Sequence, residues 1–202
     1  AGTGATGTWT LVNGTGTITA LHSPTTTVTG LSVGTNRFRW TINNGPCPST
    51  QDEVVITVYS NVQPVANAGP DISICSPAST VTMNGNAATA PATGTWSIVS
   101  GIGTITSPNS RNTTVTGLPV GVHVFRWSIS NGPCTPAITT DDVTVTVYSP
   151  SSTNANAGAD QSVCTPGGVV LVGNSPTAPA AGIWTVVSGS GIITTPDAAT
   201  TT

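Results

Sequence analysis

The sequence contains no lysine, and charged residues of both signs make up only 5% of its 202 residues. With a formal net charge of -3, the chain has no basic patch that could neutralise phosphates. This composition argues against binding to nucleic acid or to an anionic lipid surface. The lack of lysine also excludes Lys–Asn isopeptide cross-links, because no side-chain amine is present to form them. No run of 18 or more apolar residues occurs, so no segment is predicted to insert into a membrane.

Residues that would indicate catalysis are also scarce. There is no C-x-x-C pair for zinc, no pair of carboxylates suited to a cleft and no phosphate-binding loop. The two histidines are not equivalent, because His22 aligns with Asn109 and His123 with Asn36. We expect a histidine that does not recur to be a surface residue. The sequence therefore predicts no enzyme activity and no catalytic cofactor.

What the sequence does contain is a repeat. The phrase FRWTINNGPC at 38–47 returns as FRWSISNGPC at 125–134, which is 87 residues later. The segments around Trp9, Trp96 and Trp184 also align, at spacings of 87 and 88 residues. A fixed period of this length is typical of a tandem array of one structural unit.

The alignment divides the chain into three units. Residues 66–152 form a complete repeat, which opens with ANAGPD as the next one opens with ANAGAD. Residues 1–65 are predicted to be a partial repeat that lacks its first strands, and residues 153–202 a partial repeat that lacks its last strands. The sequence is therefore interpreted as a piece of a longer protein.

Each repeat shows the alternation of short β-strands. In VFRWSIS, the residues Phe125, Trp127 and Ile129 fall on one face, and DDVTVTVY places its three valines on one face in the same way. Turn-forming residues separate these segments, and no stretch has a helical period. About seven short strands in each period of about 87–89 residues predict an all-β chain of tandem immunoglobulin-like sandwiches.

The recurring tryptophans are predicted to be core residues. With the strands lettered A to G, Trp96 lies on strand C and Trp127 on strand F, which are neighbours in one sheet. A surface tryptophan that stacks on a sugar ring is the less favoured alternative, because these positions alternate with polar residues. The predicted core aromatic residues are Trp9, Trp40, Trp96, Trp127, Trp184, Phe38 and Phe125. In the middle repeat the expected aliphatic partners are Val81, Met83, Ile98 and Val115.

The four cysteines recur at two positions in the repeat. Cys75 and Cys164 end a first strand, whereas Cys47 and Cys134 follow strand F, and in an exported protein this pattern favours disulfides. Two pairings are open: Cys75 with Cys134 inside one repeat, or Cys75 with the matching cysteine of the following repeat. Free thiols are the less favoured third alternative. Topology disfavours the first, because the A–B and F–G turns lie roughly 30 Å apart, and a disulfide needs Cα atoms within about 7 Å.

Carboxylates recur near the repeat junctions and at the start of strand G. They could bind Ca²⁺ at the junctions, because that ion takes oxygen ligands from flexible loops. The simpler interpretation, which we favour, is that they are solvated turn residues and charges that protect strand edges. These residues are Asp52, Glu53, Asp71, Asp141, Asp142 and Asp160.

Four segments together resemble a known kind of repeat: ANAGPDISIC, GTWSIVSGIGTIT, TVTGLPVGVHVFRWSISNG and TDDVTVTVY. They are similar to the PKD-like and Ig-like tandem repeats of giant cell-surface adhesins of gliding Bacteroidota, of which the SprB-like adhesins are an example. The resemblance implies an extracellular array, exported by the type IX secretion system, that serves as a stalk in adhesion and gliding motility. One departure is that GTWSIVSG stands where many PKD domains have a WDFGDG-like motif.

The favoured function is a structural segment of a cell-surface adhesin or filament, because near-identical repeats use their sequence for cores and turns. The expected partners are neighbouring repeats of the same chain, and beyond them a surface polysaccharide, the substratum or like chains. The alternative is a set of carbohydrate- or protein-binding modules appended to a secreted enzyme. That alternative predicts a cluster of exposed aromatic residues, for which only Tyr59 and Tyr148 qualify.

Overall fold

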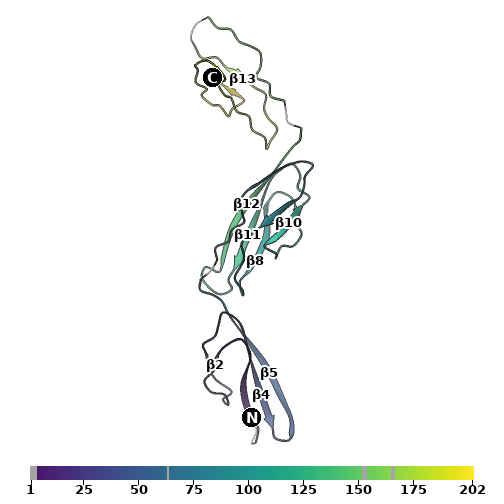
Figure 1. The fold of residues 1–202 in the computed structure, drawn as a ribbon, viewed down its shortest axis with the longest axis vertical. Helices are drawn as coiled ribbons and strands as arrows, with labels where there is room; N and C mark the ends of the chain where they lie inside the picture. The colour runs from purple at the N-terminus through teal and green to yellow at the C-terminus, as the bar shows by residue number, and fades with distance from the viewer. Residues whose placement is uncertain (1–3, 63, 152–153, 165–166) are drawn as a thin grey trace.

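The computed structural model describes residues 4–62, 64–151, 154–164 and 167–202. These residues form strands and loops and no helix, so none of them belongs to a helix long and apolar enough to cross a membrane. Three bodies follow one another along the long axis of the molecule (Figure 1). The predicted boundary between the second and third repeats, at residues 152 and 153, lies outside the described residues.

The middle body is a sandwich of two sheets. One sheet has the order β6-β12-β11-β8 and the other the order β7-β10-β9. The strands are β6 (Ile72–Cys75), β7 (Val81–Asn84), β8 (Thr93–Ser100), β9 (Thr104–Ile105), β10 (Asn112–Thr116), β11 (Gly121–Ser130) and β12 (Ile138–Tyr148). In the lettering used above, the sheets are A-G-F-C and B-E-D. The predicted fold class, tandem immunoglobulin-like β-sandwiches, is confirmed.

The core of this sandwich comes from strict alternation on β11 and β12. Phe125, Trp127 and Ile129 are at most 1% exposed, as are the three inward valines of β12, while the residues between them face outward. The two strands pair antiparallel over their whole length, whereas β6 pairs with β12 in parallel. The period of two therefore fixes which face of this hairpin is buried.

One expected core residue lies elsewhere. Ile98 was predicted to be buried, and its side chain is 44% exposed. It lies on β8, the outermost strand of its sheet, where the register with β11 shifts between Val124 and Phe125. An irregularity of this kind changes the direction of nearby side chains, so alternation counted from Trp96 fails at this point.

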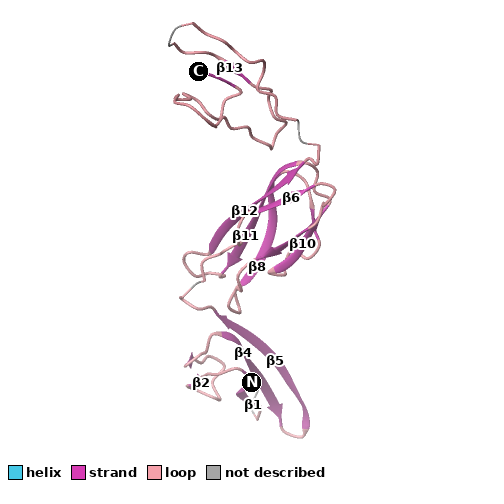
Figure 2. Ribbon diagram, turned by 45° about the horizontal axis from the view of Figure 1, so that its top comes forward, coloured by secondary structure: helices cyan, strands magenta, loops and turns pink. Residues whose placement is uncertain are grey.

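The first and third bodies contain fewer paired strands (Figure 2). In the first, β1 (Thr6–Asn13), β4 (Gly34–Asn44) and β5 (Cys47–Val58) form one sheet. Beside it, β2 (Thr17–Ile18) pairs with β3 (Val28–Thr29). In the third, β13 (Leu171–Val172) pairs with β14 (Thr200–Thr201). Among the described residues, the first body has no counterpart of β6 and β7, and the third has none of β6, β8, β9, β11 and β12, so Cys164 does not end a strand there.

Candidate functional site

The tryptophans form a cross-strand pair inside the middle repeat. Trp96 on β8 lies opposite Trp127 on β11, with ring centroids 5.0 Å apart and an angle of 42° between the planes. Their exposures are 2% and 1%. Trp96 Nε1 donates to the carbonyl of Arg111 at 3.1 Å, and Trp127 Nε1 donates to Asn86 Oδ1 at 3.2 Å. Because both indole N–H groups are buried and satisfied, this pair is part of the core and offers no stacking surface to a sugar.

The same pair occurs in the first repeat, where it is less covered. Trp9 and Trp40 have ring centroids 5.0 Å apart at 43°, and both are half-buried although neighbouring Phe38 is 1% exposed. A hollow of about 300 Å³ lies against Trp9, Phe38 and Ile56. The first repeat has no counterpart of β6 and β7 among the described residues, so this hollow is an uncovered core face rather than a built binding site.

In the third repeat the tryptophan is also only partly covered, because counterparts of β11 and β12 are missing among the described residues. Trp184 is half-buried, and its Nε1 donates to the carbonyl of Ala198 at 3.1 Å. A hollow of about 280 Å³ beside it is lined mainly by small residues and backbone. In the middle repeat, β11 and β12 fill the corresponding space, so this hollow is also an uncovered core face.

The two histidines have different environments. His22 is exposed, and its Nδ1 lies 3.2 Å from both Thr8 Oγ1 and the carbonyl of Gly7. The expectation that His123 is a surface residue is wrong, because it is 3% exposed. Its Nδ1 accepts the N–H of Ile102 at 3.0 Å, and its Nε2 donates to the carbonyl of Pro119 at 2.9 Å.

Asn36 makes the matching contacts in the first repeat. Its Oδ1 accepts the N–H of Thr15 at 2.9 Å, and its Nδ2 donates to the carbonyl of Ser32 at 3.0 Å. Asparagine and neutral histidine side chains both present one N–H donor group and one acceptor atom. His123 and Asn36 therefore make equivalent hydrogen bonds, which tie two turns together in each repeat.

The carboxylates at the repeat boundary bind backbone amides. Asp71 Oδ1 accepts the N–H of Thr144, and Asp141 Oδ2 accepts the N–H of Ala68, both at 2.8 Å. These bonds tie the start of the repeat to β12. Among the described residues, no group of three or more His, Cys, Asp and Glu side chains could hold a metal ion. Ca²⁺ binding at the junctions stays a prediction without a coordinating cluster to support it.

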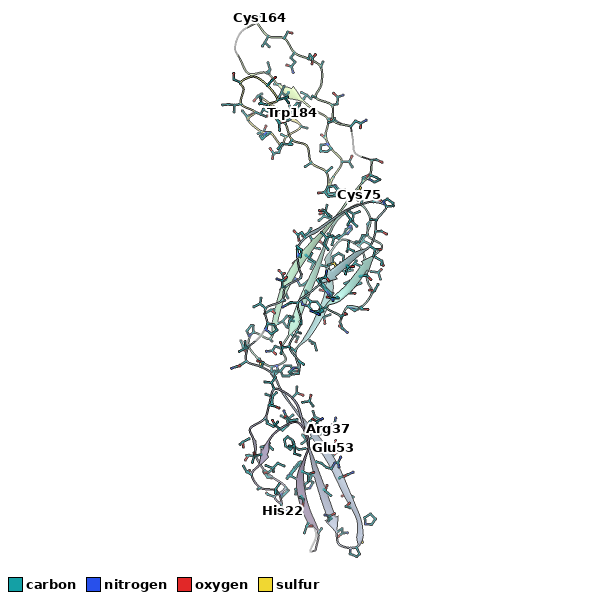
Figure 3. All side chains as sticks on the ribbon, viewed as in Figure 1. His22, Arg37, Glu53, Cys75, Cys164 and Trp184 are labelled. Carbon is teal, nitrogen blue, oxygen red and sulfur yellow. The ribbon has the colours of Figure 1, made fainter. Side chains whose placement is uncertain are left out.

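A cross-strand ion pair recurs on the outer face of the sheet. Arg126 Nε and Nη2 donate to the two carboxylate oxygens of Asp142 at 2.7 and 2.9 Å. Hydrogen bonding from this guanidinium lowers the pKa of the Asp142 carboxyl, although burial opposes the shift. Arg39 and Glu53 form the equivalent pair in the first repeat, where Figure 3 labels Glu53.

The first two repeats touch through the F–G turn of the second, and the sequence analysis did not single out the two residues that make the contact. Asn131, 2% exposed in the turn between β11 and β12, donates from Nδ2 to the carbonyl of Ser60 at 2.8 Å. At the same place, a Cβ on Gly132 would lie 2.5 Å from Cζ of Tyr59, so a larger residue would have to displace the tyrosine ring. The signal was present in the repeat itself, since the NGPC turn and the tyrosine both recur with the period.

All four cysteines are thiols in the structure. Cys75 is opposite Tyr148 at one end of β12, whereas Cys134 precedes β12 at its other end. Eleven residues at about 3.4 Å each separate these ends by about 37 Å. The pairing of Cys75 with Cys134 inside the repeat is therefore wrong. Figure 3 shows Cys75 at the end of the middle body that faces the third.

Comparison with known proteins identifies the middle repeat. Residues 68–147 match the model of the K319L-like PKD domain family, and no curated protein matches the chain. Among solved structures, the PKD domain of human KIAA0319 is 21% identical, with 48% of this chain and 88% of that chain covered and a TM-score of 0.37. Mouse cadherin-23 EC22–24 is 14% identical, with 84% and 63% covered and a TM-score of 0.33. The two-sheet segment of residues 68–147, with its paired indoles, is thus similar to the K319L-like PKD domains.

Proposed function

We propose that this chain is a structural repeat segment of a large extracellular adhesin or surface filament, in which it acts as an extended stalk. The observation that carries the proposal is the end-to-end succession of the repeats (Figure 1), with a direct contact between Asn131 of the second and Ser60 of the first. In a tandem array each unit contacts only its neighbours, so length increases with the number of repeats.

The size of the increment follows from the strands. The 11-residue β12 runs along the repeat and spans about 37 Å at about 3.4 Å per residue. Each repeat then adds a distance of this order to the stalk. The polar groups described above are used to hold strands and turns together, which supports a structural role without enzyme activity.

The finer assignment rests on the resemblance of the repeat sequences. We infer an extracellular, cell-surface location, and the PKD match over residues 68–147 supports it. We further propose that the complete protein is an adhesin of the SprB-like gliding-motility kind, exported by the type IX secretion system. Its outer partners would then be a surface polysaccharide, the substratum or like chains.

Small-angle X-ray scattering of the purified chain tests the stalk. The matched variant lacks residues 61–149, which removes one period and joins Ser60 to Pro150. The maximum dimension is expected to fall by about one repeat length, roughly 40 Å. An unchanged maximum dimension would mean that the repeats fold back on one another, and the stalk proposal would be wrong.

Imaging of the cells that make the protein tests adhesion. Deletion of the gene is expected to abolish surface filaments and attachment, while deletion of one period shortens the filaments and leaves attachment in place. Normal attachment in the deletion strain, combined with loss of a secreted enzyme activity, would favour binding modules appended to an enzyme instead.

A further inference from the structure

We propose that consecutive repeats are joined by a disulfide. It links the cysteine that ends the first strand of one repeat to the cysteine in the F–G turn of the next. In this chain, Cys134 is the turn cysteine of one such junction, and Cys75 is the first-strand cysteine of the junction that follows. The proposal rests on the proposed function in one respect, the oxidising extracellular setting, and it adds a covalent reinforcement to the stalk.

The first step is the position of Cys75. β6 runs parallel to β12, so Cys75 is the register partner of Tyr148, and the N–H of Ser76 donates to the carbonyl of Tyr148 at 2.9 Å. Cys75 is exposed, and Tyr148 is 37% exposed. Both residues therefore lie at the pole where the chain leaves the middle repeat.

The second step is the contact across the described junction. Tyr59 is the counterpart of Tyr148, 89 residues earlier, and follows β5 where the chain leaves the first repeat. Its ring lies against Gly132, whose φ of +57° belongs to the left-handed region that favours glycine. The Asn-Gly-Pro-Cys turn of the second repeat thus sits on the tyrosine of the first.

The third step combines these positions. In a complete repeat, the first-strand cysteine is the lateral neighbour of this tyrosine, at about 4.8 Å between strands. Cys134 is two residues beyond Gly132, hence at most about 7 Å from it along the chain. Both cysteines therefore lie at the same junction on either side of one tyrosine, and the proposed disulfide requires the turn to bring their Cα atoms within about 7 Å.

The burial of the turn cysteines agrees with this arrangement. Cys134, in the turn that meets the first repeat, is partly buried. Cys47 occupies the same position in the first repeat, where no preceding repeat is present in the sequence, and is exposed. The turn cysteine that lies at the described junction is thus less exposed than its counterpart in the first repeat.

The bond forms by thiol–disulfide exchange with a disulfide-containing oxidant, such as oxidised glutathione or a thiol oxidoreductase. One cysteine thiolate attacks the oxidant's disulfide, forms a mixed disulfide and releases one oxidant thiolate. The second cysteine thiolate then displaces the remaining oxidant sulfur. The two protein thiols lose two electrons and two protons, and the oxidant disulfide is reduced to two thiols.

The test supplies the missing partner to the described junction. A copy of residues 66–87 is fused before Ala1, which aligns with Ala88, so that the first repeat gains counterparts of β6 and β7 and a cysteine equivalent to Cys75. After oxidation with glutathione disulfide, non-reducing mass spectrometry is expected to show a peptide that joins the added cysteine to Cys134. The cross-link should be absent in the C134S variant. Cys134 recovered as an alkylated thiol, or bonded to Cys75, would overturn the proposal.

A second measurement uses the unaltered chain and does not depend on the fusion folding. Alkylation of Cys134 is expected to be several-fold slower than that of Cys47, and Tyr59→Ala should bring the two rates together. Equal rates before the substitution would overturn the proposal, because the turn would not be covered. Neither result changes the scattering experiment, so failure of the cross-link and failure of the stalk are distinguishable.

Discussion

The ten-residue segment that recurs at 38–47 and 125–134 lies in a different environment in the first and middle repeats. Trp127 is 1% exposed and Trp40 is half-buried, although each stacks on its partner indole at the same 5.0 Å. Asn131 is 2% exposed, whereas its counterpart Asn44 is exposed. The recurring segment therefore forms a strand and pairs its indole in both repeats, whether or not it is fully buried. The burial of these residues comes from neighbouring segments. Gly85 and Asn86, directly after β7, lie against Trp127, and the first repeat lies against Asn131.

The largest contrast is expected for the tryptophans. Trp127→Ala removes a fully buried indole and should lower the free energy of unfolding of the middle repeat by about 3–5 kcal/mol. Trp40→Ala should cost clearly less, because part of its ring already faces an open hollow. Urea unfolding, followed repeat by repeat through amide hydrogen exchange, measures both. Equal losses would show that the first repeat is as well covered as the middle one.

A smaller contrast is expected at the glycines beneath these rings. A Cβ on Gly94 would collide with the Trp127 ring, and one on Gly7 would collide with Trp40. Gly94→Ala should cost about 1–3 kcal/mol, because the packed core cannot yield. Gly7→Ala should cost less, since Trp40 has open space into which it can move. The unfolding midpoints of the two variants in urea test this, and a more damaging Gly7→Ala would contradict the comparison.

The next effect concerns His123 and its counterpart Asn36. His123→Ala leaves the N–H of Ile102 without its partner, at a cost of about 1–3 kcal/mol. His123→Asn should restore most of this loss, because asparagine makes both bonds in the first repeat. Thermal unfolding compares the variants. If asparagine is no better than alanine, the two positions are not equivalent.

The junction turn offers a matched pair of variants. Asn131→Ala removes the bond to Ser60 and should weaken the contact between repeats by about 0.5–1.5 kcal/mol. Asn44→Ala, in the exposed copy of the turn, should have almost no effect. Amide hydrogen exchange around residues 59–62 and 131–134 measures the opening of the junction. Similar exchange in both variants would argue that the repeats are not held together at this turn.

The smallest effect is expected for the surface ion pair. The pKa of Asp142 is lowered in the folded state by hydrogen bonding from Arg126. The contribution of the Arg126–Asp142 pair to the free energy of unfolding is therefore fully present above the unfolded aspartate pKa of about 3.9. It is lost as the pH falls through the pKa of Asp142 in the folded state. Asp142→Asn should remove this part of the acid dependence of unfolding, and salt should weaken it in the parent chain. An unchanged acid profile would show that the pair contributes nothing measurable.

The sequence was sufficient for the strands and most of the core, because alternation fixes which side chains of a sandwich face inward. The prediction for Ile98 was wrong, because the alternation of polar and apolar residues in the sequence does not indicate where the register between two strands shifts. The expectation for His123 was wrong because a histidine that does not recur was taken to have no structural role in the repeat. Its alignment with Asn36 held the signal, as both residues present a donor and an acceptor. The topology of the sandwich predicts that the F–G turn lies at the junction, but it does not predict the contacts of Asn131 and Gly132, because these residues lie in a turn, where no periodic pattern indicates which side chains are in contact.

Completion of the first repeat tests the central claim most directly. In the chain with residues 66–87 fused before Ala1, amide hydrogen exchange of residues 38–42 and acrylamide quenching at Trp40 are compared with those of the unaltered chain. If the segment at 38–42 is a core strand that lacks only the strands that cover it, Trp40 should become as protected from exchange and quenching as Trp127. A Trp40 that stays open while the fused strands remain unpaired would contradict the claim that the repeats are copies of one sandwich.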